Sequence, residues 1–459
     1  MILELHKKLK AGNISAKELA EEYLKIAEDK NKVLNSYISI TKDYAISHLP
    51  DKIESILDGI PGCIKDNINI LSTNTTAGSQ VLKEYISPYT ATVISNLDKF
   101  TLIGKGNMDS FAFGSTTQNS YFGPSLNPHD INTVAGGSSG GVASAVAAGS
   151  AVFGIGSDTG GSVRQPASFC GIVGLKPTYG LISRYGLISM GSSFDVIGIM
   201  ANTVDDVALI LNEACKYDPK DSTSLNIKKK IDYSKFSDIS KLKVGVLKFN
   251  DDGVEKNVIT AFSNSIEDIK KLGCSVKEVV IDHLKYVIAA YYILVPSEIS
   301  ANMARFDGIR FGYHPKGIKD LEEFYIEARS KFEDEVKRRI LIGTYTLSSG
   351  YYDAYYSKAD AVRRLIKQEF DEAFRDIDVI VSPTSPTVAY RKDKVFDNPL
   401  ELYLSDIFTI PANLIGAPAI SIPNGLSCDN LPTGLQIMGP QLSELNILSL
   451  ANKLYKKYG

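Results

Sequence analysis

Cysteine is scarce in this sequence, and the cysteines that are present lie far apart. They are Cys63, Cys170, Cys215, Cys274 and Cys428. Their spacings match neither a zinc site nor a compact disulfide framework. The N-terminus also lacks the pattern of a secretory signal peptide. These absences indicate a protein of the reducing cytoplasm that holds no metal ion.

A long apolar segment and an excess of positive charge are also missing. The most apolar stretch, residues 142–155, consists mainly of alanine, valine and glycine and is too short to cross a bilayer. A buried helix followed by a buried strand explains it better. The formal net charge is −3, whereas proteins that bind nucleic acid by bulk electrostatics usually have a basic domain. We therefore expect no membrane contact, and any RNA should be held by a partner.

What the sequence does contain is typical of a globular protein. Hydrophobic residues make up 44% and charged residues 22% of the 459 residues, which are ordinary proportions for a soluble chain. The length allows one large domain with insertions or two closely packed domains. Alternating strands and helices argue for a layered α/β core. Because no long flexible linker is present, we predict one compact unit with a helical insertion over residues 284–375.

Short apolar runs predict the strands, and runs with helical periodicity predict the helices. Strands are expected at residues 101–103, 152–155, 188–190, 242–247, 276–281, 379–381 and 419–422. Helices are expected near the N-terminus, at residues 142–149 and 254–272, and over about the last sixteen residues. Ser15 followed by Glu18 predicts a capping box. Gly273 stands where a helix stop is expected.

Two glycine-rich segments contain serines, and a lysine stands upstream of both. The segments read Gly-Gly-Ser-Ser-Gly-Gly at 136–141 and Ser-Asp-Thr-Gly-Gly-Ser-Val-Arg-Gln-Pro at 157–166. The lysine lies in Gly-Ile-Pro-Gly-Cys-Ile-Lys-Asp-Asn-Ile at 59–68. An amide hydrolase needs an activated nucleophile, a base and clustered backbone N–H donors. Serines, lysine and glycine-rich backbone can supply all three without histidine, cysteine or metal, so the combination predicts an enzyme.

Other functions of glycine-rich loops fit less well. A phosphate loop of the Walker type ends in Gly-Lys-Ser/Thr, and no lysine follows the first loop. A dinucleotide-binding fingerprint would need its third glycine one residue before Gly160. A nucleophile elbow matches at Ser138 and at Ser139, but it requires a downstream histidine, and His283 and His314 lie outside any glycine-rich context. Glycines that merely allow tight turns remain an alternative for either loop alone.

Several separated motifs resemble the amidase signature family. They are the Gly-Gly-Ser-Ser-Gly-Gly loop, Gly-Gly-Ser-Val-Arg-Gln-Pro at 160–166, Cys-Gly at 170–171, Gly-Leu-Lys-Pro-Thr-Tyr-Gly at 174–180 and the upstream Ile-Lys-Asp-Asn. The resemblance implies an α/β amidase-signature fold, with a central mixed β-sheet covered by helices on both faces. It also implies a single amidase domain over residues 1–459, with a signature core at about 59–205, the helical insertion at about 284–375, and C-terminal strands and a helix at 376–459.

Members of this family use a serine–cis-serine–lysine triad, which implies roles for three residues. Ser162 would be the nucleophile that forms the acyl ester, Ser138 the bridging serine after a cis peptide bond, and Lys65 the base. A lysine acts as a base only when neutral, so its pKa must fall from roughly 10.4 through burial or nearby positive charge. Asp66 would oppose this, and we expect its side chain to point elsewhere. Ser138 would pass the nucleophile's proton to the lysine and return it to ammonia.

The turn that carries the nucleophile is expected to stabilise the oxyanion. Backbone N–H groups clustered in one turn form a nest for developing negative charge, and glycine lets the backbone approach the substrate. The predicted donors are the N–H groups of Thr159, Gly160, Gly161 and Ser162.

Two polar residues near these loops are expected to have structural roles. Arg164 should pair with Asp158 or with backbone carbonyls rather than with substrate. Ser139 should stabilise its loop or cap a helix. The tyrosines at 351–356 are interpreted as packing or partner interface rather than chemistry.

Further motifs resemble the family of A subunits of glutamyl-tRNA(Gln) amidotransferases. They lie at 304–312 (Ala-Arg-Phe-Asp-Gly-Ile-Arg-Phe-Gly), 336–340 (Val-Lys-Arg-Arg-Ile), 347–356 (Leu-Ser-Ser-Gly-Tyr-Tyr-Asp-Ala-Tyr-Tyr) and 405–407 (Ser-Asp-Ile). In that family the A subunit is a glutaminase that supplies ammonia to a B subunit, which uses ATP and Mg²⁺ to activate the glutamyl end of the misacylated tRNA. A small C subunit clasps the two. The resemblance implies B and C subunits as partners, charged tRNA held mainly through B, and no cofactor on this chain.

Glutamine is a zwitterion, so its pocket needs a cation and a carboxylate. The residues of the family fall on Arg339 and Asp406, and Tyr292 is implied to line the same pocket. The neighbouring Arg338 and Tyr291 leave an ambiguity of one residue at two of these positions. Without the resemblance, Arg339 would be interpreted as a solvated charge on a helix.

Two alternatives to a glutaminase subunit stay open. A stand-alone amidase would act on a small amide without partners and would not need the pair Arg339 and Asp406. A catalytically silent scaffold of the complex is disfavoured because Lys65, Ser138 and Ser162 are all present.

Overall fold

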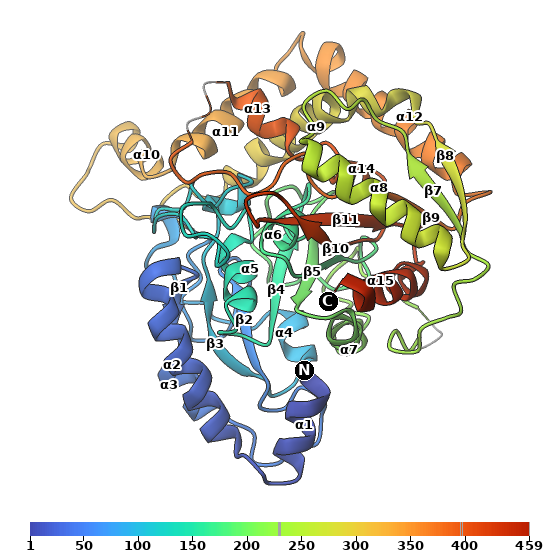
Figure 1. The fold of residues 1–459 in the computed structure, drawn as a ribbon. Helices are drawn as coiled ribbons and strands as arrows, with labels where there is room; N and C mark the ends of the chain where they lie inside the picture. The colour runs from blue at the N-terminus through green and yellow to red at the C-terminus, as the bar shows by residue number, and fades with distance from the viewer. Residues whose placement is uncertain (228–230, 395, 397, 459) are drawn as a thin grey trace.

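In the computed structural model, the described residues are 1–227, 231–394, 396 and 398–458. Their strands form one eleven-stranded sheet in the order β1-β3-β2-β4-β6-β5-β10-β11-β9-β7-β8 (Figure 1). The strands are β1 (Tyr37–Ile40), β2 (Pro61–Lys65), β3 (Thr101–Gly106), β4 (Phe153–Asp158), β5 (Val173–Lys176), β6 (Val196–Ala201), β7 (Lys243–Leu247), β8 (Ser275–Val279), β9 (Val379–Pro383), β10 (Ala419–Leu426) and β11 (Pro432–Met438). β2 is parallel to β3 and β4, β7 is parallel to β8 and β9, and the other pairs are antiparallel. The predicted mixed sheet is confirmed.

Helices cover both faces of this sheet. Successive residues of a strand point to opposite faces, and here both faces are apolar, so each must be covered. In β2, Ile64 packs into one apolar cluster and Cys63 into another. In β6, Ile199 and Met200 divide in the same way. The first cluster receives side chains from α4 (Thr92–Asn96), α7 (Val204–Ala214) and α15 (Glu444–Tyr458). The second receives them from α2 (Ala16–Leu34) and α5 (Gly140–Ala147).

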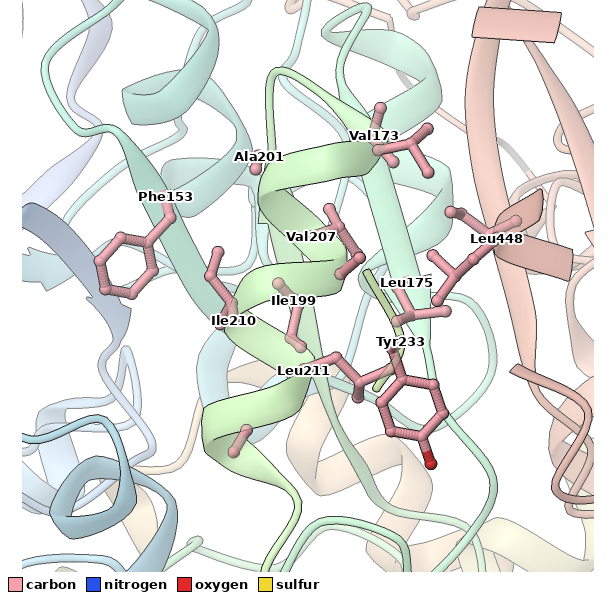
Figure 2. Packing of buried hydrophobic residues seen from close by; sticks show 14 of the residues in the cluster. Phe153, Val173, Leu175, Ile199, Ala201, Val207, Ile210, Leu211, Tyr233 and Leu448 are labelled. Atoms are coloured by element: carbon pink, nitrogen blue, oxygen red, sulfur yellow. The ribbon is translucent and has the colours of Figure 1, made fainter. Parts of the chain in front are cut away.

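Helix α7 illustrates how the first face is held. Thr203 caps its N-terminus by accepting a hydrogen bond from a backbone N–H of the first turn, which satisfies a donor that the helix cannot pair itself. Val207 and Leu211 lie over Ile199 and Leu175 of the sheet (Figure 2). All four side chains are fully buried, and each such burial stabilises the fold by about 1.5–3 kcal/mol.

The chain between β8 and β9 is mostly helical. It contains α9 (Val287–Met303), α10 (Leu321–Ser330), α11 (Asp334–Leu347), a π-helical turn η4 (Tyr352–Tyr356) and α12 (Ser357–Ala373). α9 and α11 cross so closely that a Cβ on Gly343 would overlap the carbonyl oxygen of Pro296. α9 also lies beside the loop that follows β4, where Gly160 faces Tyr291. The helical segment therefore forms one wall of the region where the predicted nucleophile stands.

Most elements expected from the sequence are present. The expected strands near residues 102, 154, 245, 278, 380 and 420 are β3, β4, β7, β8, β9 and β10, and the expected helices include α5, α8 (Lys256–Lys271) and α15. The capping box is confirmed, since the Glu18 N–H donates to Ser15 Oγ at 3.1 Å and the Ser15 N–H donates to the Glu18 carboxylate at 2.8 Å. Gly273 follows α8 with φ +88°, a conformation that favours glycine.

The predicted strand at residues 188–190 is wrong. Only an isolated bridge joins Leu187 to Ile68, and the Ile188 N–H donates to the carbonyl of Asn67 at 2.8 Å. This segment is apolar because it packs as a loop against the chain after β2. Five strands were not expected, namely β1, β2, β5, β6 and β11. Glycine, lysine or proline interrupts several of them, so their sequences lack a clear apolar run.

Three surface and composition features complete the fold. Among the described residues, no helix combines the length and apolar character needed to span a bilayer. The five cysteines are unpaired thiols. Tyr351, Tyr352 and Tyr355 are exposed. The rings of Tyr351 and Tyr355 contact each other and Tyr345, whereas Tyr352 stacks on Tyr356, which packs against the interior. The interpretation of these tyrosines as packing or interface stays a prediction.

Candidate active site

Lys65 is the last residue of β2, and its side chain is fully buried. The Nζ atom donates to Ser138 Oγ at 2.8 Å, to Ser157 Oγ at 2.9 Å and to the Ser157 carbonyl at 3.2 Å. Burial lowers the pKa of Lys65 to about 7, although three buried carboxylates oppose the shift, those of Asp109, Asp158 and Asp195. The amine is thus neutral in a large fraction of molecules near neutral pH, as a base requires.

Asp66 points away from the lysine, as expected. Its carboxylate forms an ion pair with Lys105 at 3.1 Å and accepts hydrogen bonds from the hydroxyl and the N–H of Thr76. Both members of the ion pair are buried. Asp66 therefore holds the loop after β2 and leaves the charge on Lys65 to be set by burial.

Ser138 lies in the first glycine-rich loop, and the Gly137–Ser138 peptide bond is cis, as the resemblance implied. The loop meets the second one through its backbone, because the Ser139 N–H donates to the Ser162 carbonyl at 3.1 Å. Among the described residues, no hydrogen bond links the Ser162 hydroxyl to Ser138. The structure therefore contains the hydrogen bond between Lys65 and Ser138 and places Ser162 beside them. The second hydrogen bond of the proton route, between Ser138 and Ser162, is not formed among the described residues.

The turn around Ser162 differs from expectation at one of its four predicted donors. The Gly161 N–H donates to Asp158 Oδ1 at 3.0 Å and is not free for an oxyanion. This correction has a simple cause, since the carboxylate of Asp158 is buried at the end of β4 and must collect donors. The N–H groups of Thr159, Gly160 and Ser162 have no partner among the described residues.

Glycine is needed at position 160 because the backbone runs against a tyrosine. A Cβ at Gly160 would lie 2.6 Å from the hydroxyl oxygen of Tyr291. The carbonyl of Gly160 accepts a hydrogen bond from Thr409 Oγ1 at 2.6 Å. Both contacts fix the plane of the turn, and this fixes the direction of its free N–H groups.

Arg164, the first residue of α6 (Arg164–Phe169), is structural, as predicted. It binds Asp158 through two nitrogens, at 2.9 and 3.0 Å, and donates further to Asn413 and Gln436. Burial would raise the pKa of Asp158, but the guanidinium beside it lowers that pKa to about 2. Ser139 has a loop role, because its hydroxyl donates to the Ser157 carbonyl at 3.2 Å and makes no capping bond to α5.

Ser157 and Asn67 are site residues that the sequence reasoning missed. Asn67 Nδ2 donates to Ser157 Oγ at 3.0 Å, and the same oxygen accepts from Lys65. Because Ser157 also offers its carbonyl to Lys65, it contacts the amine on two sides. Both residues lie inside the motifs that identified the lysine and the nucleophile, so their position in those motifs was the available signal.

The arginine predicted to bind a carboxylate is buried in α11. Arg339 is 4% exposed, whereas the side chain of Arg338 is 48% exposed, so Arg339 is the residue that lines the interior. Its Nε donates to Glu335 at 2.8 Å, and its guanidinium lies 5.2 Å from the ring centre of Tyr292. Its two terminal nitrogens have no hydrogen-bond partner among the described residues. They form a pair of free donors suited to a carboxylate.

The predicted carboxylate, Asp406, lies close to the same tyrosine. Its Oδ2 accepts hydrogen bonds from Ser115 at 2.7 Å and from the Tyr292 hydroxyl at 3.4 Å. Burial raises the pKa of Asp406 to about 7. The Asp406 carbonyl also accepts from Thr409 Oγ1 at 3.1 Å, and that hydroxyl holds Gly160. Of the two tyrosines, Tyr292 contacts the carboxylate and Tyr291 contacts the oxyanion turn.

The class of enzyme follows from the fold and from the presence of a lysine, as the base, beside the serine. A mixed sheet that presents a buried lysine to a serine after a cis peptide bond is the arrangement of the amidase-signature hydrolases. The sequence profile of the amidase family matches residues 18–448. This chain belongs to the amidase family.

Named relatives and solved structures show which kinds of amidase this chain is similar to. The A subunit of glutamyl-tRNA(Gln) amidotransferase from Thermoanaerobacter pseudethanolicus is 47% identical over 463 residues, covering 98% of this chain and 94% of the relative. The crystal structure of the A subunit of the same name from Thermotoga maritima has a TM-score of 0.80 and 39% identity, covering 95% of this chain and 91% of that one. A peptide amidase solved with chymostatin has a TM-score of 0.83 at 25% identity, covering 99% of this chain and 97% of that one. The fold is thus similar in proteins with different named activities.

Proposed function

We propose that this chain is the glutaminase subunit of a glutamyl-tRNA(Gln) amidotransferase. The observation that carries the proposal is the pair of guanidinium nitrogens on buried Arg339 that have no partner among the described residues, with Asp406 at the hydroxyl of the same Tyr292. A substrate with a carboxylate and an ammonium group matches this pair, and glutamine has both next to a primary amide. The identity with amidotransferase A subunits over nearly the whole chain supports the same substrate.

The reaction would use the residues as follows. The Ser162 hydroxyl attacks the side-chain amide carbon of glutamine, and its proton passes through the Ser138 hydroxyl to the neutral Lys65 amine. The N–H groups of Thr159, Gly160 and Ser162 stabilise the oxyanion. The C–N bond then breaks as the proton returns to the departing nitrogen, giving ammonia and an acyl ester. Water repeats the sequence to release glutamate and the free serine.

Substrate binding would complete the proton chain. Hydrogen bonds in catalytic sites often tighten only in the substrate complex, and the missing link here is between Ser162 and Ser138. Asp406 would hold the ammonium group, and Thr409 connects the backbone of Asp406 to Gly160. Correct seating of glutamine would therefore orient the turn that carries the nucleophile.

The remaining parts of the assembly belong to the same proposal. A B subunit would bind ATP and Mg²⁺ and hold the charged tRNA, since the net charge of −3 offers no basic domain for RNA. A small C subunit would join the two, and the complex would work in the cytoplasm. The stand-alone amidase is the second candidate, and the similar fold of the peptide amidase keeps it in consideration.

Co-purification with a glutamine assay tests the proposed function. Tagged chain should bring down a B-type subunit from cells, and the purified chain alone should hydrolyse glutamine slowly. Adding the partner subunits and charged tRNA should stimulate hydrolysis at least tenfold. Hydrolysis of small neutral amides that partners do not change, with no co-purifying subunit, would favour the stand-alone amidase.

The pH dependence of the glutaminase should show two groups that must lose a proton. Lys65 is active when neutral and Asp406 binds the ammonium when ionised, and both have a pKa of about 7 in the free enzyme. As pH falls through 7, both active forms disappear together. The logarithm of kcat/KM should therefore decline with a slope approaching two below about pH 6, and Asp406→Asn should reduce the slope to one. A wild-type slope of one would exclude one of the two groups.

A further inference from the structure

A groove with a volume of about 1030 Å³ lies beside the loop that leads into α10, the helix at the left of Figure 1. Three segments line it, namely residues 80–85, residues 187–189 and the loop between α9 and α10. That loop contributes residues 305–306, 308–314 and 316. The volume lies at the upper end of the range for small-molecule pockets, so the groove has room for a peptide segment.

The charge of the groove is predominantly positive. Its cationic lining residues are Lys83, Arg305, Arg310 and Lys316, and its acidic lining residue is Glu84. Arg310 pairs with Asp307 of the same loop. Arg305 bonds only to Asn302, and neither Arg305 nor Lys316 forms an ion pair within the described part of the chain. Two cations are therefore available to carboxylates of another molecule.

Exposed apolar side chains stand between these cations. Ile309 is 58% exposed, Phe311 53%, Tyr313 38% and Tyr89 38%, and all four line the groove. Contiguous apolar surface rimmed by polar groups is typical of protein interaction sites. Although three of these four side chains are aromatic, the net charge of −3 gives the chain no bulk electrostatic attraction for RNA, which favours a protein over a nucleic acid as the occupant.

The floor of the groove continues directly to the catalytic base. Asn69 lines the groove, is 3% exposed, and its Oδ1 has no hydrogen-bond partner among the described residues. Its N–H donates to the Gly186 carbonyl at 2.9 Å. Two residues earlier, Asn67 binds Ser157, which in turn binds Lys65. A donor placed on Asn69 would act on the short segment that positions this network.

We propose that this groove binds an acidic segment of a partner protein that also carries a large apolar side chain, and that its occupation stimulates glutamine hydrolysis. The inference rests on the proposed function, because it assigns the partner contact of the same active site. Carboxylates of the segment pair with Arg305 and Lys316, and its apolar side chain packs between Ile309 and Phe311. A donor on the segment satisfies Asn69 and fixes residues 65–69, which holds the Lys65 amine in its 2.8 Å contact with Ser138 while substrate is bound.

The test uses the full chain and the purified partner subunits. A double charge reversal, Arg305→Glu with Lys316→Glu, changes exposed residues that take no part in the chemistry. The matched control is Lys30→Glu with Lys256→Glu, two exposed lysines on α2 and α8 that also lack ion pairs within the described residues. The groove variant should bind the partner subunits at least tenfold more weakly and lose their stimulation of glutaminase activity. Its unstimulated activity should equal that of wild type, and the control should match wild type throughout.

Any result that differs from these expectations contradicts a specific part of the inference. Unchanged partner affinity in the groove variant overturns the docking site. Weaker binding with full stimulation at saturating partner overturns the link to Lys65. A loss of affinity for tRNA alone identifies a nucleic-acid occupant, and an altered oligomeric state of the chain alone identifies a second copy. If the partners fail to stimulate wild type, it is the proposed function that fails, and this result is separate from all the others.

Discussion

Replacing Ser162 with alanine is expected to abolish glutamine-supported amide transfer in the assembled enzyme while ammonia-supported transfer continues. Removal of the nucleophile in a serine hydrolase lowers kcat by at least about 10⁴-fold. In the proposed assembly the partner subunit uses ammonia from either source, so added ammonium salt should restore the product. Rates of glutamine hydrolysis and of tRNA-linked product, each measured with glutamine and with ammonium chloride, check this prediction.

Ser139→Ala is the matched control for Ser162→Ala. Both residues lie in the glycine-rich loops, but within the described part of the chain the Ser139 hydroxyl makes a single hydrogen bond, to the Ser157 carbonyl. Its removal should cost one buried hydrogen bond, about 1 kcal/mol of stability, and leave most of the activity. If Ser162→Ala loses ammonia-supported transfer as well, the serine serves the structure, and the proposed nucleophile would have to be abandoned.

Arg339→Ala is expected to raise the KM for glutamine about 100-fold with a much smaller change in kcat. Truncating one partner of a buried, hydrogen-bonded charge pair costs about 2–5 kcal/mol, and the pair is the guanidinium with the α-carboxylate of glutamine. The carboxylate is remote from the bond that breaks, so its loss acts mainly on binding. Steady-state kinetics over a wide range of glutamine concentrations measure the effect.

Arg338→Ala provides the control, because Arg338 is largely exposed and also pairs with Glu335. It should leave KM within about twofold of wild type, as expected when an exposed ion pair is lost. Arg339→Lys should give an intermediate KM, since lysine keeps the charge but lacks the two parallel donors. A KM unaffected by Arg339→Ala would remove this residue from the pocket. Retained hydrolysis of a neutral amide would show that the variant is folded.

The sequence predicted secondary structure and site residues correctly where a local pattern of residue types is specific to one element or one chemistry. The apolar run at 152–155 became β4, and the small-residue run after Gly140 became α5. Glycine-rich motifs pointed to Lys65 and Ser138, which the structure brings to 2.8 Å across 73 residues of chain. The pattern failed at residues 188–190, because an apolar loop and an apolar strand have similar composition when both are buried.

The sequence could not predict the direction in which individual N–H groups point. Gly161 has φ +136° and turns its N–H to Asp158, which removes it from the predicted oxyanion donors. The same limit applies to Ser157, whose two contacts with Lys65 depend on how β2 and β4 are aligned. Alignment of neighbouring strands depends on contacts across the whole sheet, and these are not encoded in any one motif.

The sequence by itself determined which reactive groups this protein has, and its glycine-rich motifs singled out two serines and a lysine as the candidates for its chemistry. It also contained the ambiguity between Arg338 and Arg339. Tertiary structure alone decided which arginine is buried, what the pKa of Lys65 becomes, and where Asp66 points. The physical reason is that a residue type defines a donor, an acceptor or a charge, whereas desolvation and pairing depend on what the folded chain places around it.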